Sequence, residues 1–309
     1  MSVVVLTGGV GGAKLALGLT SLLGGEQVTA IVNTGDDFAH LGLVVSPDID
    51  TLLYTLSGKA NAAQGWGREG ESWNFMAALR SLGGEDWFQL GDGDLALHVL
   101  RSMRLRMGDG LAAIIADFAG AWDITAKILP MTESPVWTTL GTDEGELYFQ
   151  HYFVARRCQP VVHRISFGGV DLADPGPGVI EAIGDPATTA ILIAPSNPFL
   201  SIDPILAVPG IREALRSSAT PVVAVSPLVG GQAVKGPTAK LMAELGLEVN
   251  VAAVARHYGD VIDGILVDER DPPAALTVAS ARADTMMHTL EDRIRVAQAA
   301  LDLAAAVKR

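Results

Sequence analysis

The chain has 309 residues, 49% of them hydrophobic, and its mean hydropathy is +0.32. This length and composition bury a large core, which excludes a mainly disordered protein and predicts one α/β domain over residues 1–309. The 22 Lys and Arg residues against 35 Asp and Glu give a formal net charge of −13. Because a basic surface supplies most of the affinity for nucleic acid, this acidic balance argues against nucleic acid as a general partner.

Cysteine content and the start of the chain predict the compartment. A single cysteine, Cys158, cannot form an intramolecular disulfide. The first residues have no basic region, no cleavage site and no apolar run long enough to span a bilayer. We therefore expect a soluble, cytoplasmic protein without a membrane partner.

The first 33 residues predict a strand, a glycine loop, a helix and a second strand. Residues 3–6 are apolar and β-branched and are bounded by glycines, which is typical of a buried parallel strand. Leucines recur at helical spacing up to Leu23, and residues 28–33 form the next apolar run, which leads into a polar turn. Two parallel strands joined by a helix make a right-handed βαβ unit.

The remaining pattern predicts a Rossmann-like, mostly parallel sheet flanked by helices. Residues 58–125 have helical periods, so we expect a mainly helical insert there, between core segments 1–57 and 126–309. Apolar runs before Ser196 and Ser226 predict further core strands, and the last residues from Thr285 predict an amphipathic helix. Ligands of open parallel sheets bind outside the carboxyl ends of the strands, so the polar groups there can share one cleft.

The glycine loop between the first strand and helix contains Gly8, Gly9, Gly11, Gly12 and Lys14. Glycines allow backbone N–H groups to approach a phosphate, and the start of the following helix stabilises its charge. The segment departs from the Walker pattern and from G-x-G-x-x-G. It predicts a phosphate-binding loop, with a tight turn for helix packing as the alternative.

Acidic side chains follow the second strand. Asp36 and Asp37 lie in its turn, and Asp48 and Asp50 come shortly after. Mg²⁺ prefers one or two carboxylates together with phosphate oxygens and water, so either pair suits a metal near a phosphate loop. Alternatively, Asp36 and Asp37 are turn residues, and Asp48 or Asp50 caps the next helix.

Within the helical insert, Asp94, His98 and Arg101 fall on one helix face. Such a face can orient a carboxylate, a proton carrier and an anion clamp, and Asp92 adds another acid at the helix start. Alternatively, Asp94 only caps the helix and pairs with His98.

Trp66 and Trp73 flank a glycine-containing loop with Arg68, and this arrangement is typical of a stacking platform for a flat ring system. Packing into the core is the alternative. Small polar groups at the ends of the later strands suit a base or ribose, or else form turns. The helix start near Lys235 and Gly236 suits another phosphate contact.

Six segments together resemble the 2-phospho-L-lactate transferase family of CofD/FbiA type, which acts in coenzyme F420 biosynthesis. They are TGGVGGAKLALGL, VNTGDDF, SPDIDTLLYTLSG, LGDGDLALHVLR, APSNP and GPTAKLM. They run in order from residue 3 to about residue 242, and LVDERDP and SARADTMM extend the resemblance.

The resemblance implies a Rossmann-like core with a helical insert, assembled as a homodimer. It also implies transfer of a phospholactyl-type unit from its guanosine-diphosphate adduct to the deazaflavin Fo, with release of GMP and help from Mg²⁺. Branches of the family use 2-phospholactate, phosphoenolpyruvate or 3-phosphoglycerate as the donor acid, and the sequence leaves this choice open.

The resemblance assigns roles to matching residues. Asp48 and Asp50 are expected to be catalytic and to hold the metal. The nucleotide is expected at Gly8, Gly9, Gly11, Gly12, Lys14, Asn33, Ser196, Asn197, Pro198, Ser226 and Gly236. Fo is expected at Asp50, Trp66, Trp73, Asp92, Asp94 and His98.

One departure concerns Gly93, where family members often have Arg, so the anion contact there is expected either to be missing or to come from Arg68 or Arg101. Two other classes compete. CofD-like regulatory proteins bind nucleotide-sugars at a similar glycine loop without transferase activity. An NAD-dependent dehydrogenase also starts with a βαβ unit, but the third glycine is missing and Asp36 comes after the turn.

Overall fold

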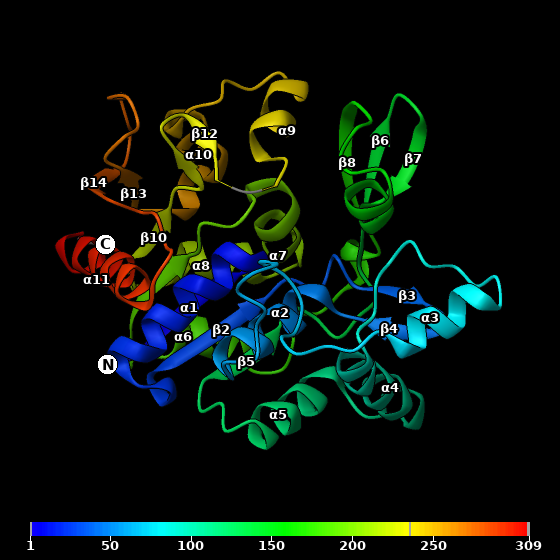
Figure 1. Cartoon of the computed structure of the whole chain (residues 1–309). Helices are drawn as coiled ribbons and strands as arrows, with labels where there is room; N and C mark the ends of the chain where they lie inside the picture. Colours follow the sequence, from blue (N-terminus) through cyan, green and yellow to red (C-terminus); the bar gives the residue numbers. More distant parts are fainter. Residues whose placement is uncertain (1, 235, 308–309) are drawn as a thin grey trace.

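The computed structural model describes residues 2–234 and 236–307. A seven-stranded parallel sheet lies at the centre of the fold (Figure 1). Its strands are β1 (Ser2–Thr7), β2 (Val28–Val32), β5 (Lys127–Pro130), β9 (Thr188–Ile193), β10 (Val222–Val225), β13 (Gly264–Asp268) and β14 (Ala279–Ala283). They are ordered β14-β13-β10-β9-β1-β2-β5. The order reverses between β1 and β9, which is where ligands bind in doubly wound sheets. The predicted Rossmann-like sheet is confirmed.

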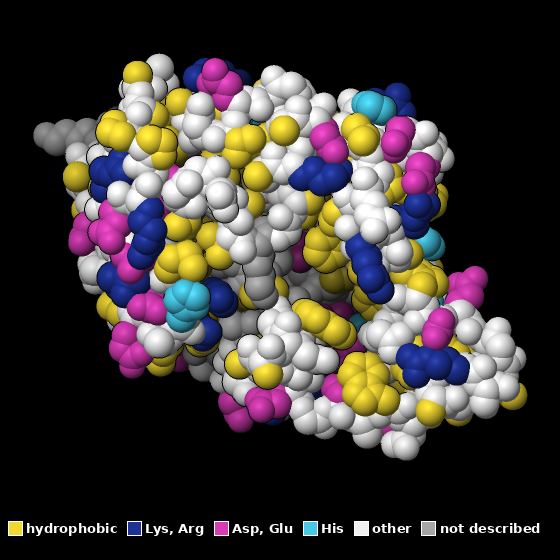
Figure 2. All heavy atoms as spheres, turned by 45° about the horizontal axis from the view of Figure 1, so that its top comes forward, with side chains coloured by type: hydrophobic (Ala, Val, Ile, Leu, Met, Phe, Trp, Pro, Cys, Tyr) yellow, Lys and Arg dark blue, Asp and Glu magenta, His cyan; other side chains and the backbone are white. Residues whose placement is uncertain are grey.

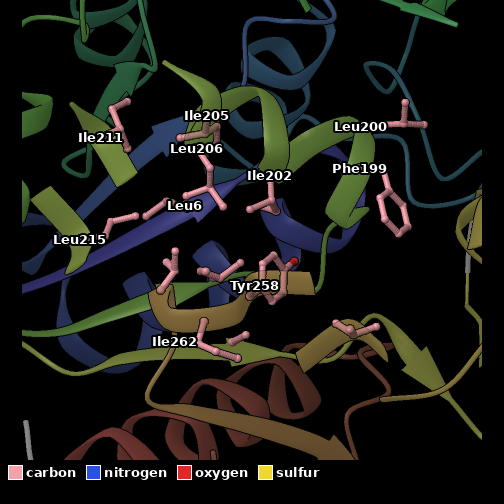
Figure 3. Close-up of a cluster of buried hydrophobic side chains, with 14 of the residues drawn as sticks. Leu6, Phe199, Leu200, Ile202, Ile205, Leu206, Ile211, Leu215, Tyr258 and Ile262 are labelled. Atoms are coloured by element: carbon pink, nitrogen blue, oxygen red, sulfur yellow. The ribbon is translucent and has the colours of Figure 1, made fainter. Parts of the chain in front are cut away.

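Alternate side chains of β1 enter two hydrophobic cores, one on each face of the sheet. Val3 and Val5 pack with helices α1 (Gly9–Leu23), α2 (Pro47–Leu56) and α11 (Leu290–Ala306). Val4 and Leu6 pack on the opposite face. The helices there are α6 (Val179–Gly184), α7 (Asp203–Ala207), α8 (Ile211–Ser217), α9 (Thr238–Glu244) and α10 (Val251–Tyr258). Figure 3 shows Leu6 among side chains of these helices and of the segment before α7. Burial on both faces explains the continuous apolar runs of the strands.

Residues 58–125 contain the helices α3 (Asn74–Ser81), α4 (Asp92–Met107) and α5 (Leu111–Ala121). Helix α5 packs against β5, and its Leu111 and Ile115 belong to the core that contains Val3. The helical segment is therefore joined to the sheet through α5, while its limits as an insert stay a prediction.

An antiparallel sheet of three strands, which the sequence did not predict, is formed by the described residues between β5 and β9. Its strands are β6 (Trp137–Thr142), β7 (Gly145–Tyr148) and β8 (Val162–Gly168), ordered β7-β6-β8. Figure 1 shows it standing above α3 and α4 at the right of the molecule. Smaller hairpins pair β3 (Phe38–His40) with β4 (Leu43–Val45) and β11 (Leu228–Val229) with β12 (Gln232–Ala233).

Short helical turns complete the connections. They are the 3-10 turns Gly25–Gln27, Val170–Leu172 and Gly259–Val261 and the π-helical turns His151–Ala155 and Pro198–Ile202. No helix in the described part of the chain is long and apolar enough to cross a membrane.

The C-terminal helix begins later than predicted. Helix α11 starts at Leu290, not at Thr285. The Thr289 hydroxyl accepts a hydrogen bond from the backbone N–H of Asp292, and the Asp292 carboxylate accepts one from the backbone N–H of Thr289. This capping box provides acceptors for two backbone N–H groups. It therefore fixes the start of α11 directly after Thr289.

Candidate active site

A cavity of about 460 Å³ opens at the carboxyl ends of β1, β9 and β10. Its walls come from the glycine loop, α2, the loops after β9 and β10, the helical segment 58–125 and the residues after β7. Figure 2 shows this hollow in the middle of the molecule, with hydrophobic side chains around it and acidic side chains visible inside. It lies at the switch point of the sheet, and its volume suits a small-molecule ligand.

The glycine loop approaches the loop after β9 so closely that side chains are excluded at two positions. A Cβ atom on Gly11 would lie 2.6 Å from the backbone oxygen of Pro195, and one on Gly12 would lie 2.8 Å from Ser196 Oγ and 2.0 Å from Thr7 Oγ1 at the end of β1. Gly12 faces Thr7 and does not line the cavity, whereas Gly11 does. Glycine is therefore required at Gly11 for the loop to reach the cavity.

Two backbone donors of this loop are already engaged. The N–H of Gly8 donates to Ser196 Oγ at 3.2 Å, and the N–H of Gly9 donates to Asp48 Oδ1 at 2.6 Å. Val10 and Gly11 follow in the first turn of α1, so their N–H groups have no partner within the helix, and both residues line the cavity. These two donors, at the positive end of the α1 dipole, can receive a phosphate.

Asp48 connects the glycine loop to the end of β2. Its Oδ2 accepts a hydrogen bond from Asn33 Nδ2 at 3.0 Å, and the same amide donates to the Leu200 carbonyl at 3.3 Å. Burial raises the pKa of Asp48 to about 6, against the opposing effect of Asn33 and the Gly9 N–H. Asn33 itself does not line the cavity. It therefore positions Asp48 and the loop.

Asp36 lines the cavity beside Asp48, whereas its neighbour Asp37 does not line it. Burial, followed by the charge of Asp48, raises the pKa of Asp36 well above its usual range, and burial raises the pKa of Asp37 likewise. Asp37 Oδ2 accepts a hydrogen bond from the Ser46 hydroxyl at 2.6 Å. The Oδ1 atoms of Asp36 and Asp37 are buried without a partner among the described residues. Burial thus favours the neutral, protonated form of both carboxyl groups.

Asp50 forms a buried ion pair with Arg101. Arg101 Nη1 donates to Asp50 Oδ2 at 3.2 Å, and Nη2 donates to Oδ1. His98 Nδ1 lies 3.7 Å from Asp50 Oδ2. The prediction that Arg101 clamps a substrate anion is wrong, because its side chain is fully buried and its fork already holds a carboxylate.

The pairing of Asp94 with His98, the alternative interpretation of the α4 face, is present in the structure. His98 Nε2 lies 3.1 Å from Asp94 Oδ2, and the Tyr54 hydroxyl donates to Asp94 Oδ1. Burial acts to raise the pKa of Asp94, but His98 and Tyr54 outweigh it, so that pKa lies below its ordinary value. Asp94, His98 and Tyr54 all line the cavity. Together with Asp50 they form a connected polar wall.

Asp92 and Trp73 are not brought to the cavity. The Asp92 carboxylate accepts hydrogen bonds from the Ser72 hydroxyl and from the backbone N–H groups of Asn74 and Phe75, where α3 begins. These contacts, with Ser72 first, lower the pKa of Asp92 to about 2. Asp92 therefore caps α3, and neither it nor Trp73 lines the cavity.

The anion contact expected from Arg68 is also not found. Arg68 Nη1 lies 3.2 Å from Glu71 Oε1, and Arg68 is not among the lining residues. A Cβ atom on Gly93 would lie 2.3 Å from Arg68 Nη1. The Arg68 guanidinium thus occupies the room beside Gly93.

Trp66 lies half-exposed on the cavity wall, as a platform for a flat ring requires. Other aromatic groups of this wall were not predicted, although Tyr54 lies within the recognised segment SPDIDTLLYTLSG. They are Tyr54, Phe88, Phe149 and Phe153. Their common feature, an apolar ring beside polar residues, gives no signal in a single sequence.

The strand-end residues reach the cavity with one exception. Ser196, Asn197, Ser226 and Gly236 line it, whereas Pro198 is buried at the start of a π-helical turn. Asn197 Oδ1 caps this turn by accepting the N–H groups of Phe199 and Leu200, and its Nδ2 is buried without a partner among the described residues. This amide is a donor available to a ligand. Lys235 lies outside the described residues.

Lys14 is the only Lys or Arg among the described residues that line the cavity, and its Nζ donates to the Met287 carbonyl at 2.7 Å. Met286 and Met287 also line it, and the block SARADTMM was the signal for them. Beside this lysine, four acidic side chains line the cavity. They are Asp36, Asp48, Asp50 and Asp94.

Comparisons with known proteins identify the family of this chain. The family model of the 2-phospho-L-lactate transferase CofD matches residues 3–305. A phosphoenolpyruvate transferase from Streptomyces coelicolor is 41% identical over 319 residues, covering 100% of this chain and 99% of the relative. A 2-phospho-L-lactate transferase from Methanosarcina mazei is 38% identical over 300 residues, covering 96% of this chain and 98% of the relative.

Among solved structures, a member of the UPF0052 family from Bacillus halodurans aligns with a TM-score of 0.63 at 18% identity. The alignment covers 97% of this chain and 98% of that one, and it shows the fold alone. The family model and the two transferases, by contrast, match nearly the whole chain with substantial identity. The chain therefore belongs to the CofD family of 2-phospho-L-lactate transferases and is a transferase.

Proposed function

We propose that this protein transfers a phospho-acid unit from its guanosine-diphosphate adduct to the terminal ribityl hydroxyl of Fo, in coenzyme F420 biosynthesis. The hydroxyl oxygen forms a new bond to the phosphorus nearer the acid. The bond from that phosphorus to the bridging oxygen breaks, and GMP leaves. The observation that carries the proposal is that the glycine loop at the start of α1, buried acidic side chains and an aromatic wall line one cavity.

The diphosphate lies, in this proposal, at the start of α1. The N–H groups of Val10 and Gly11 and the Lys14 side chain face the cavity there. The guanosine extends toward Asn197, whose Nδ2 lacks a partner among the described residues, and Ser226. An unpartnered amide donor suits a carbonyl oxygen on a base, because pairing removes the cost of its burial.

The deazaflavin ring lies against Trp66 and the aromatic wall, so that its ribityl chain points to Asp50 and Asp94. Flat rings stack on such side chains with offset or edge-to-face geometry. Asp50 or Asp48 accepts the proton of the attacking hydroxyl. Positioning contributes more than this base, as is usual in phosphoryl transfer.

The residues present fit Mg²⁺. No cluster of three or more His, Cys, Asp or Glu side chains is arranged for a metal within the described residues. Mg²⁺ needs only one or two carboxylates when phosphate oxygens complete its shell. Asp36 has a buried oxygen without a partner there, and Asp48 lies close enough to raise its pKa.

Of the two ligands that the sequence suggested, Asp50 already uses both oxygens on Arg101, so Asp36 suits the metal better beside Asp48. Bound there, Mg²⁺ would neutralise the diphosphate and the charge that develops on it. The proposal includes phosphoenolpyruvate, 2-phospholactate and 3-phosphoglycerate as donor acids. Relatives named for the first two match this chain almost equally well.

We further propose a homodimer, supported by apolar side chains exposed on one side of α4. Val99, Leu100, Met103 and Met107 are all at least 45% exposed and recur at helical spacing. Exposed apolar rows of this kind mark association surfaces. Light scattering of the protein and of Met103→Glu measures the mass: a dimer that Met103→Glu converts to monomers supports the proposal, and a monomeric protein contradicts it.

Fo binding separates the transferase from a nucleotide-sugar-binding regulator. Titration of the protein with Fo at millimolar Mg²⁺, followed by deazaflavin fluorescence, should give a saturable change. Adding the donor adduct should then release GMP only when Fo is present. Absence of Fo binding together with tight nucleotide-sugar binding would favour the regulator.

A further inference from the structure

A second cavity, of about 330 Å³, lies behind the β11–β12 hairpin. It has no lining residue in common with the first cavity. The hairpin separates the two, because Val229 lines the first cavity and Gly231 lines the second. The remaining wall is formed by the start of α10 and by residues 271–275. The second cavity is large enough for a small organic molecule.

One wall of the second cavity carries a buried, half-satisfied carboxylate. Asp271 is only 4% exposed. Its Oδ1 accepts a hydrogen bond from the Gly231 N–H at 2.7 Å, whereas its Oδ2 has no partner among the residues that the structure describes. Leaving a buried carboxylate oxygen unpaired is costly, so this wall calls for a donor with positive charge.

Another wall of the second cavity carries positive charge. Asn250 caps α10 by accepting the N–H of Ala253 at 2.8 Å. Val251 and Ala252 precede it in the first turn, so their N–H groups have no intrahelical acceptor, and both residues line the second cavity. Arg256, one turn later, also lines it, and among the described residues its one ion pair is a long, exposed contact of 3.4 Å with Glu248. This wall suits an anion.

We propose that the second cavity binds a small zwitterion of the amino-acid type. The ammonium group meets Asp271 Oδ2, and the carboxylate meets the start of α10 and Arg256. A ligand with only a positive charge would leave the start of α10 and Arg256 without an anion. A ligand with only a negative charge would leave Asp271 without a cation. Only a ligand with both charges matches the two walls, while Pro273 and its neighbours provide room for a short apolar body.

The test uses the complete protein and three zwitterions with different charge spacing, L-alanine, β-alanine and 4-aminobutyrate. Propylammonium chloride and sodium propionate serve as the two half-ligands at equal ionic strength. Isothermal titration calorimetry and thermal unfolding should show saturable binding of at least one zwitterion. Each half-ligand should bind at least tenfold more weakly.

Asp271→Asn is the informative variant, because the amide oxygen can still accept the Gly231 N–H, so the hairpin contact is kept. It should weaken zwitterion binding at least tenfold, and Arg256→Gln should weaken it severalfold. Asp171→Asn, on the exposed surface, is the matched control and should bind as the unchanged protein does.

Three results would overturn the proposal: no saturable binding by any zwitterion, equal binding by a half-ligand, or unchanged binding by Asp271→Asn. The first of these would mean that the second cavity holds water only. No readout involves Fo, a donor adduct or turnover. Failure here therefore leaves the proposed transferase reaction untouched, and failure of that reaction leaves the second cavity untouched.

Discussion

The Arg101 guanidinium and the Asp50 carboxylate hold each other through two hydrogen bonds, and both side chains are almost fully buried. Arg101 belongs to α4 and Asp50 to α2, so the pair joins the helical segment to the cavity wall. Burial acts to lower the pKa of Arg101, but the Asp50 carboxylate raises it above its ordinary value. The charges of the two residues are therefore compensated only by each other and by their close neighbours.

Breaking this pair should destabilise the protein. We expect Arg101→Leu to lower the free energy of unfolding by about 3–5 kcal/mol, because it leaves a buried carboxylate without its counter-ion. Urea unfolding followed by circular dichroism measures the change. Arg104→Leu, on the same helix but at a more exposed ion pair, is the control and should cost about 1 kcal/mol or less. Equal losses for both variants would mean that Arg101 is not needed as the partner of Asp50.

A methyl group on the glycine loop should weaken nucleotide binding. In Gly11→Ala the new Cβ atom would lie 2.6 Å from the Pro195 oxygen, so the loop must shift away from the ligand. We expect the Kd for GDP to rise at least about tenfold, which corresponds to about 1.4 kcal/mol.

Gly120→Ala provides the matched control for this prediction. Gly120 lies in α5, and a Cβ atom there would meet nothing within 4 Å. It should leave the Kd unchanged and stabilise the protein by up to about 1 kcal/mol. Calorimetric titration with GDP compares the variants. Unchanged affinity in Gly11→Ala would remove the loop from the nucleotide site.

The buried carboxyl group of Asp48 predicts how the free energy of unfolding depends on pH. The pKa of Asp48 is raised to about 6, so the folded protein holds this proton more tightly than the unfolded chain does. The contribution of Asp48 to stability is therefore present at low pH and is lost as the pH rises from about 4 to about 6. The difference in free energy of unfolding between the protein and Asp48→Asn should fall over this range.

Mg²⁺ should reverse that loss, because it binds the ionised carboxylates. We expect millimolar Mg²⁺ to raise the Tm more at pH 8 than at pH 5, and to raise it little in Asp48→Asn. Asp171→Asn, far out on the surface, should respond as the unchanged protein does. If Mg²⁺ does not change the Tm at pH 8 in the presence of GDP, the proposed metal site is contradicted.

Trp66 and Trp73 should differ in their effect on Fo, because only Trp66 lines the cavity. Loss of one aromatic contact is worth about 1 kcal/mol, so Trp66→Ala should raise the KM for Fo about fivefold. Trp73→Ala should leave that KM unchanged. Steady-state kinetics with varied Fo measures both. The opposite ranking would place the ring on another wall.

Local patterns were sufficient to predict the elements around the switch point. Val3 to Leu6 is apolar because both faces of β1 are covered, and the glycines that follow fit close approaches that only glycine permits. The pairing of Asp94 with His98 follows from helical spacing alone. These features depend on neighbours within a few residues along the chain or on burial that shows directly in composition.

Long-range partners were not predictable. Helical spacing correctly predicts that Arg101 lies on the same face of α4 as His98. It does not predict that the Arg101 guanidinium binds the Asp50 carboxylate. Asp92 looked like a cavity acid, yet it binds the start of α3 about twenty residues earlier in the chain. The sheet of β6 to β8 was not predicted because its strands are only partly buried, which weakens their alternation.

The product of the transfer reaction tests the central claim most directly. The protein should be incubated with Fo, Mg²⁺ and each guanosine-diphosphate adduct of 2-phospholactate, phosphoenolpyruvate and 3-phosphoglycerate, and the products weighed by mass spectrometry. We predict that at least one adduct yields Fo carrying one phospho-acid unit, with an equal amount of GMP, and that Asp50→Asn yields little or none. Unmodified Fo with all three adducts, from a protein that binds both Fo and GDP, would contradict the proposed reaction.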